Sequence, residues 1–314
     1  MADLELKTVT RTQGNNRALK DGTVKPKTFE FAFEEVDPLI AAFRRMVRGN
    51  EFDICEMAIT TYICAKAHGK PMTAVPVFLV RAFHHGAVLV NAKAGIGTPK
   101  DLEGRRVGVN RGYTVTTGVW ARSILQEEHG VDLGKITWVL SGDEHVAEYR
   151  PPANVVPIEP GRNMGDMLAS GELAAAIGIE ADSPDVKPLI PNALEAGLAA
   201  LRRNGHYPIN HTVVIRDELI ARHPDLAADV FLAFAESKRR YVERLHAGRI
   251  EKPTAVDEMH RRVMAIAGDP LPYGVTPNRK VIDELIRHAL TQGIITKPVT
   301  ADELFAPSTR ALVA

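Results

Sequence analysis

Short apolar segments that end in polar side chains alternate with helix-like segments through much of this chain. Three of these apolar segments carry Glu56, Arg81 and Arg111 at or near their carboxyl ends. Such alternation is typical of parallel sheets with helices on both faces. In open α/β sheets, ligands bind beyond the carboxyl ends of the strands, so these side chains are expected to converge on one crevice. Cationic groups around one carboxylate would suit a small, doubly charged organic anion.

The composition is that of an ordinary globular protein with a small-molecule ligand. Hydrophobic residues make up 45% and charged residues 25% of the 314 residues, enough chain for two domains with a real core in each. Lys+Arg and Asp+Glu are both 39, so no net electric field would attract nucleic acid or a membrane surface. We therefore expect neither as a partner. A homo-oligomer is compatible with the sequence.

Two features favour a cytoplasmic protein. The first residues lack the basic and apolar regions of a secretory signal, and no apolar run reaches the roughly 18 residues of a membrane-spanning helix. The only two cysteines, Cys55 and Cys64, both lie in apolar segments. Two buried thiols are more expected there than a disulfide, which fits a reducing compartment.

Loop-like composition suggests two domain boundaries. Residues 91–97 precede a fresh series of strands and helices, and the turn-rich residues 204–208 precede another strand. These boundaries predict an inserted lobe II and a discontinuous lobe I, with the ranges 93–207 and 1–92 plus 208–314. Two crossing strands would then form a hinge, and the ligand would lie between the lobes.

Arg81, His84 and His85 follow one apolar segment closely. The planar guanidinium of arginine binds carboxylates in a bidentate manner, so Arg81 either binds the ligand or pairs with an acid such as Glu56. Adjacent histidines on a strand face opposite sides, so one of the two would be structural. They also lack the spacing of a zinc pair, and no third ligand is evident, so we expect no metal.

The loop that contains Arg111, Tyr113 and Thr114 lies between a predicted strand and a predicted helix. Free backbone amides at a helix N-terminus attract anions, so this loop is a candidate binding element. The alternative is a solvent-facing arginine with ordinary capping by Thr114. His206 and His211 flank the second predicted hinge, and a core histidine is the alternative for His211.

Residues 98–109, with the sequence TPKDLEGRRVGV, resemble the crossover of type II periplasmic-binding-protein folds. Within that superfamily the chain resembles the 4,5-dihydroxyphthalate decarboxylases. The stretches that carry this second resemblance span nearly the whole chain, and they are residues 17–22, 51–57, 119–122, 208–214, 269–274 and 303–307. The resemblance implies a two-lobed α/β fold with a ligand cleft between the lobes.

The resemblance also implies cofactor-independent decarboxylation of 4,5-dihydroxyphthalate, or a close analogue, to protocatechuate and CO2. A proton donor must then reach the ring carbon, and histidine suits this role because its charge changes near neutral pH. We expect His85 or His211 to be the donor and Glu56 to be the partner of the phenol. The residues expected to bind the substrate are Thr60, Arg81, His84, Arg111, Tyr113, Thr114 and His206. The alternative is a solute-binding protein that captures an aromatic or dicarboxylic anion for a transporter.

Overall fold

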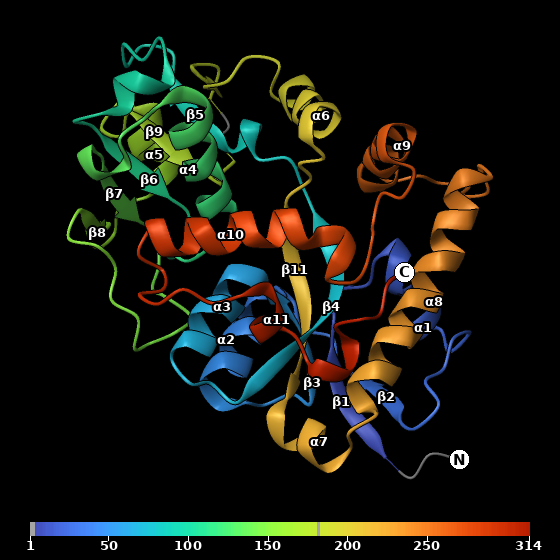
Figure 1. The fold of residues 1–314 in the computed structure, drawn as a ribbon. Coiled ribbons are helices and arrows are strands. Elements are labelled where there is room, and N and C mark those ends of the chain that lie inside the picture. The colour runs from blue at the N-terminus through green and yellow to red at the C-terminus, as the bar shows by residue number, and fades with distance from the viewer. Residues whose placement is uncertain (1–3, 181–182) are drawn as a thin grey trace.

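Two β-sheets flanked by helices form two lobes in the computed structural model, which describes residues 4–180 and 183–314 (Figure 1). The first sheet has the strand order β2-β1-β3-β11-β4, and its strands are β1 (Glu5–Val9), β2 (Glu30–Phe33), β3 (Ile54–Ala58), β4 (Met72–Arg81) and β11 (Ile209–Arg216). The second has the order β10-β5-β9-β6-β7-β8, and its strands are β5 (Val88–Asn91), β6 (Arg106–Val109), β7 (Thr137–Leu140), β8 (Val155–Pro157), β9 (Ala175–Ile177) and β10 (Val186–Pro188).

The chain passes between the lobes at two crossings. The strands that flank these crossings pair in antiparallel fashion, β4 with β11 and β5 with β10. This follows from the path of the chain, which leaves the first sheet along β4 and returns along β11. In contrast, β1 is parallel to β2 and β3, and β6 is parallel to β7 and β9. The sheets are therefore mixed, and the expectation of parallel sheets was wrong for the strands that flank the crossings.

The sheets place the first crossing a few residues earlier than the loop composition suggested. β5 pairs with β9 and β10 of the second sheet, although a boundary at residue 92 would leave it in lobe I. The two crossings lie side by side, since the backbone N–H of Ala82 donates to the carbonyl of Pro208 at 3.2 Å. We therefore propose that lobe II extends from about residue 82 to about residue 208.

Helices cover both sheets. Those of lobe I are α1 (Arg17–Lys20), α2 (Ile40–Gly49), α3 (Ile59–Ala67), α7 (Asp217–Arg222), α8 (Leu226–His246), α9 (Ala255–Ala267), α10 (Arg279–Thr291) and α11 (Ala301–Leu304). Those of lobe II are α4 (Thr116–His129), α5 (Met164–Ala169) and α6 (Ala193–Asn204). Short 3-10 helices are η1 (Gly14–Asn16), η2 (His85–Ala87), η3 (Pro99–Leu102), η4 (Leu133–Lys135), η5 (Thr276–Asn278) and η6 (Pro307–Thr309). Across the described ranges, no helix combines the length and the apolar character needed to cross a bilayer.

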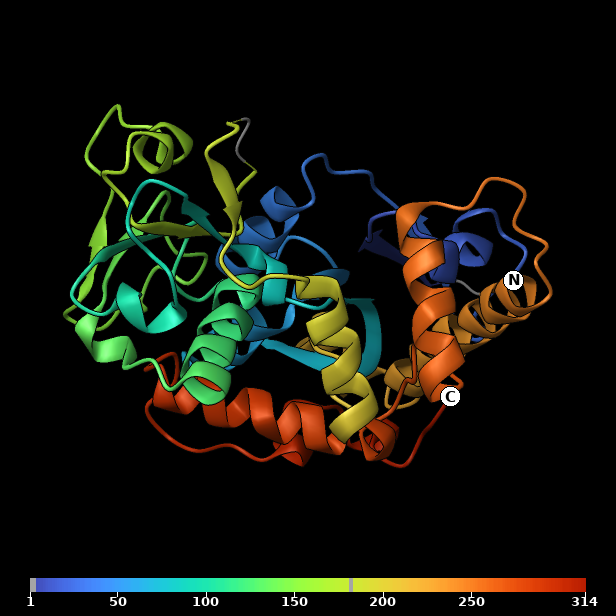
Figure 2. The same ribbon diagram turned by 90° about the horizontal axis from the view of Figure 1, so that it is seen from above.

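Helix α10 of lobe I packs against both α3 and α4, so it bridges the lobes (Figures 1 and 2). Gln292, which follows this helix, accepts a hydrogen bond from Arg122 Nε of α4 at 2.8 Å. Its amide nitrogen also donates to the carbonyl of Val119 at 3.1 Å. Because these buried groups are paired across the lobes, the contact holds the lobes in one relative position.

Candidate active site

Glu56 and His211 form a hydrogen-bonded pair across the adjacent strands β3 and β11. The distance between Glu56 Oε1 and His211 Nδ1 is 2.6 Å, and Glu56 Oε2 accepts the backbone N–H of Arg11 at 2.9 Å. Glu56 is fully buried, whereas the His211 side chain is 19% exposed. Because a carboxylate can only accept hydrogen bonds, Nδ1 of His211 is the donor. Its Nε2 is then the atom available to exchange a proton with a ligand.

Phe43 of α2 packs between two imidazole rings. Its centroid lies 5.2 Å from that of His211 and 6.3 Å from that of His145, both in edge-to-face geometry. His145 belongs to lobe II, and burial lowers its pKa to about 4, so this ring is neutral near pH 7. The aromatic contact therefore joins the lobes beside the Glu56–His211 pair.

The loop after β6 holds a carboxylate, which is the side chain of Glu144. Thr114 Oγ1 donates to Glu144 Oε2 at 2.6 Å, the backbone N–H of Thr114 donates to the same oxygen at 3.3 Å, and the backbone N–H of Tyr113 donates to Oε1. We call these three donors the carboxylate cradle. A Cβ atom at Gly112 would lie 2.5 Å from Glu144 Oε2, so the carboxylate packs directly against backbone. The cradle immediately precedes α4, where the helix dipole favours negative charge.

Arg111 lies on the same loop in the left-handed conformation, with a φ of 69°. Its backbone N–H donates to Ser141 Oγ at 2.7 Å. Its side chain is exposed, and the guanidinium makes no hydrogen bond or ion pair with any residue in the described ranges. This cation is therefore available to an external anion.

Thr60 connects α3 of lobe I to the cradle loop. Its hydroxyl is fully buried, donates to the carbonyl of Thr114 at 2.6 Å and lies 2.8 Å from Thr116 Oγ1. A hydroxyl has one proton to donate, and here that proton is already used. In this structure Thr60 therefore positions the loop.

Arg81, at the end of β4, is hydrogen-bonded to neutral oxygens. Nη1 donates to the carbonyl of Tyr207 at 2.8 Å, while Nη2 donates to the carbonyl of Pro272 at 3.3 Å and to Asn278 Oδ1. Burial lowers the pKa of Arg81 to about 10. The pairing with Glu56 that we considered is not formed, because Glu56 is bonded to His211 and Arg11 instead.

The adjacent histidines His84 and His85 contact different partners. His84 Nε2 lies 3.0 Å from Asn210 Oδ1, and burial lowers the pKa of His84 to about 4. His85 Nε2 lies 3.1 Å from Glu128 Oε1 on α4, and its ring is buried. The hydrogen bond from His85 lowers the pKa of Glu128. The two rings therefore have different partners, in line with the expectation that they face opposite sides. His85 lies in η2, however, and not on a strand as we expected.

His206 also lies against α4 and α10 rather than beside Glu56. Its Nδ1 is 2.9 Å from Glu284 Oε2 of α10, and its ring meets Trp120 at a centroid distance of 5.3 Å. A polar hollow of about 110 Å³ lies here. We expected the candidate histidines to lie at one cleft. In the structure they lie in three places, which are this hollow, η2 and the Glu56–His211 pair.

A loop of lobe II that the site prediction did not include lies against α2 of lobe I. Asp143 accepts hydrogen bonds from Arg44 at 2.6 and 3.1 Å and from Arg48 at 3.0 Å. Arg48 also donates to the backbone carbonyls of Glu144 at 2.8 Å and His145 at 3.1 Å. Residues 137–140 form a strand, and this loop follows its carboxyl end. The rule that ligands bind beyond the carboxyl ends of strands therefore also indicates this loop.

Beneath the cradle loop lies Arg122, a fully buried arginine of α4. Its Nη2 donates to the carbonyl of Tyr113 at 2.7 Å, and its guanidinium carbon lies 3.8 Å from the centroid of the Tyr113 ring. Nη1 has no hydrogen-bond partner in the described part of the chain. Burial lowers the pKa of Arg122, and the nearby charge of Glu144 opposes that effect. A buried positive charge therefore supports the cradle from below.

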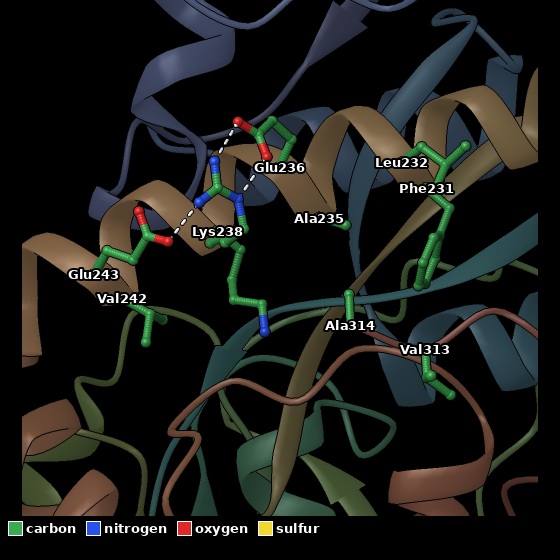
Figure 3. Close-up of a pocket in the computed structure, with 10 residues that line it drawn as sticks. Phe231, Leu232, Ala235, Glu236, Lys238, Val242, Glu243, Val313 and Ala314 are labelled. Carbon is green, nitrogen blue, oxygen red and sulfur yellow. Dashed lines mark hydrogen bonds and ion pairs between the residues drawn. The ribbon is translucent and has the colours of Figure 1, made fainter.

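A second concave surface lies at α8. It is larger than the hollow beside His206 but is lined by fewer polar side chains. This groove of about 470 Å³ is lined by Phe231, Leu232, Val313 and Ala314 (Figure 3). Its charged residues are partly paired with one another, as Arg239 is with Glu236 at 2.7 Å. Within the described residues, no group of three or more His, Cys, Asp or Glu side chains could hold a metal ion. The candidate chemistry therefore lies with the Glu56–His211 pair and the cradle.

Two α/β lobes joined by paired crossings, with polar side chains between them, define the class of two-lobed periplasmic-binding-protein-like folds. The desulfurization enzyme DSZB has this fold, with 14% identity, coverage of 98% of this chain and 97% of that chain, and a TM-score of 0.54. The aliphatic sulphonate binding protein SsuA of Escherichia coli is 12% identical over 96% of this chain and 91% of its own, with a TM-score of 0.53. These likenesses confirm the fold class predicted from the sequence.

Sequence comparison identifies the family. Residues 41–150 match the NMT1/THI5 like family. The 4,5-dihydroxyphthalate decarboxylase of Comamonas testosteroni is 32% identical over 325 residues, covering 98% of each chain. That of Pseudomonas putida is 38% identical over 176 residues, covering 53% of this chain and 67% of the relative. The chain belongs to the 4,5-dihydroxyphthalate decarboxylase family.

Proposed function

We propose that this protein is a carboxy-lyase that converts 4,5-dihydroxyphthalate, or a close analogue, to protocatechuate and CO2. The observation that carries the proposal is the pairing of buried Glu56 with the partly exposed imidazole of His211, in a member of this decarboxylase family. A fixed carboxylate that orients an imidazole is an arrangement suited to proton transfer. We place this activity in the cytoplasm, which fits two buried, unpaired cysteines.

The substrate itself supplies the electrons for this reaction. Each carboxylate of 4,5-dihydroxyphthalate is para to a phenolic oxygen. Protonated His211 donates its Nε2 proton to the ring carbon that bears the departing carboxylate, so a C–H bond forms and the para oxygen stabilises the resulting cation. The C–C bond to the carboxylate then breaks, its electron pair restores the aromatic ring, and CO2 leaves. His211 takes up a proton from solvent before the next turnover.

Glu56 acts through His211 in this scheme. Both of its oxygens already accept a hydrogen bond, from His211 Nδ1 and from the N–H of Arg11, so we assign it this role in place of the contact with the phenol that we expected from the sequence. It fixes the orientation of the imidazole and stabilises the charged form of the ring. We assign the exposed guanidinium of Arg111 to binding of the carboxylate that remains on the ring, because it has no partner among the described residues.

The other candidate residues support the site in our proposal. Each makes at least one hydrogen bond to another protein group, and these residues are Thr60, Arg81, His84, His85 and His206. His85 is a weaker candidate for the proton donor than His211, because the side chain of His85 is only 1% exposed.

Incubation of the purified protein with 4,5-dihydroxyphthalate tests the function, with CO2 and protocatechuate measured as products. His211→Asn should lower kcat by about a hundredfold, the usual scale for loss of a general acid. His246→Asn, which alters an exposed histidine at the end of α8, is the matched control and should leave kcat unchanged. Parent-like turnover by His211→Asn would remove His211 as the donor. Tight binding of the anion without CO2 release would favour solute capture for a transporter.

A further inference from the structure

The carboxylate cradle is occupied by a side chain of the protein itself. Three donors of the loop before α4 converge on the Glu144 carboxylate, which lies against Gly112. The site is thus formed, correctly spaced for a carboxylate, and filled. We propose that Glu144 is an internal ligand of this cradle and that a carboxylate of the substrate displaces it. The proposal rests on the proposed function and deepens it, because it assigns one substrate carboxylate a site and a competitor.

The charges around the cradle favour an anion of any origin. The N-terminus of the 14-residue helix α4 follows directly, and its dipole attracts negative charge. The buried guanidinium of Arg122 donates a hydrogen bond to the carbonyl of Tyr113, which is the residue before Thr114. Arg111 lies on the same loop, and its guanidinium has no partner among the described residues. Removal of Glu144 would leave the three cradle donors without their acceptor.

The loop that carries Glu144 is anchored independently of its side chain. Arg44 and Arg48 hold Asp143, and Arg48 also binds the backbone carbonyls of Glu144 and His145. These anchors use the neighbouring carboxylate and the backbone. Rotation of the Glu144 side chain out of the cradle is therefore compatible with an unchanged contact between the loop and α2.

An internal ligand lowers the apparent affinity for the external one. The substrate binds only to the fraction of molecules in which the cradle is open, so the apparent Kd rises by the inverse of that fraction. Removing the internal carboxylate should therefore tighten the binding of a small dicarboxylate. A residue that only stabilises the loop would have the opposite effect on removal.

The test measures binding of phthalate by calorimetry, because this probe lacks the ring hydroxyls that decarboxylation requires. Glu144→Ala should bind phthalate about tenfold more tightly than the parent. Acetate should compete in Glu144→Ala by filling the emptied cradle, and it should have little effect on phthalate binding by the parent. Glu148→Ala is the matched control, since Glu148 belongs to the same loop but is paired with Lys70 at 2.7 Å on the surface.

Glu144→Gln keeps the shape of the side chain and guards against misfolding of the alanine variant. It should bind phthalate more tightly than the parent, because an amide lacks the charge that holds Glu144 in place. Equal, weaker or undetectable phthalate binding in both variants would overturn the proposal. Tighter binding without any turnover of 4,5-dihydroxyphthalate by the parent would uphold the internal ligand and overturn the decarboxylase function. Turnover without tighter binding would do the reverse.

Discussion

Glu56 and His211 are 155 positions apart in the sequence, yet Glu56 Oε1 and His211 Nδ1 are 2.6 Å apart. The antiparallel register of β3 and β11 brings them together. Val213 pairs with Glu56, and His211 pairs with Ala58, so the two side chains are diagonal neighbours in the sheet. The pair therefore exists only when the chain has returned from lobe II to complete the first sheet.

Glu56→Gln should lower kcat by on the order of tenfold to a hundredfold and leave KM nearly unchanged. The amide keeps the shape of the side chain but carries no charge to stabilise the imidazolium. Steady-state kinetics with 4,5-dihydroxyphthalate checks this, and Glu51→Gln, an exposed glutamate, is the control. An increase in KM with kcat unchanged would instead assign Glu56 to substrate binding.

Arg81→Lys should lower the free energy of unfolding by about 3 kcal/mol, measured by urea denaturation. A lysine ammonium cannot replace the planar guanidinium, which donates hydrogen bonds to the carbonyls of Tyr207 and Pro272 and to the side chain of Asn278. Loss of phthalate affinity without loss of stability would return Arg81 to the binding role that the sequence suggested.

Arg111→Gln should show the opposite behaviour. The side chain is exposed and unpaired within the described residues, so the free energy of unfolding should change by less than about 0.5 kcal/mol. Glutamine carries a Cβ as arginine does, so it faces the same backbone restriction at a φ of 69°. Phthalate affinity should fall about tenfold, because a charge-assisted hydrogen bond to a carboxylate is lost. Arg105→Gln, another exposed arginine of lobe II, is the control, and parent-like affinity in Arg111→Gln would remove Arg111 from the site.

Acidification should destabilise the protein through its buried histidines. Burial holds the pKa of His84 at about 4, below its ordinary value of 6.5. The unfolded chain therefore binds a proton here between pH 6.5 and 4 while the folded chain does not, so stability falls as the pH falls through this window. Between pH 7 and 5 the loss from His84 is about 2 kcal/mol.

His84→Gln, whose amide can still donate to Asn210, should therefore lose about 2 kcal/mol less stability than the parent between pH 7 and 5. Urea unfolding at both pH values measures this, and His246→Asn, at an exposed position, should follow the parent. Equal losses in His84→Gln and the parent would show that His84 does not titrate in this window.

Local patterns were sufficient to locate two parts of the candidate site. An apolar run followed by a polar residue marked Glu56, and a strand followed by a helix marked the loop at Arg111, Tyr113 and Thr114. Both patterns depend on residues that are neighbours in the sequence, so they survive without knowledge of the rest of the fold. The same rule was not applied to the end of β7, and Glu144 was missed for that reason.

The sequence by itself determined the fold class, the family and the strand ends at which polar groups gather, because hydrophobic periodicity and short motifs are local properties. Only the tertiary structure decided which partner each polar group has. Arg81 is bonded to carbonyl oxygens, His211 to Glu56, and the cradle to Glu144. A buried polar group must be paired with whatever the packing brings near, and that neighbour is set by sheet register and by the contact between the lobes.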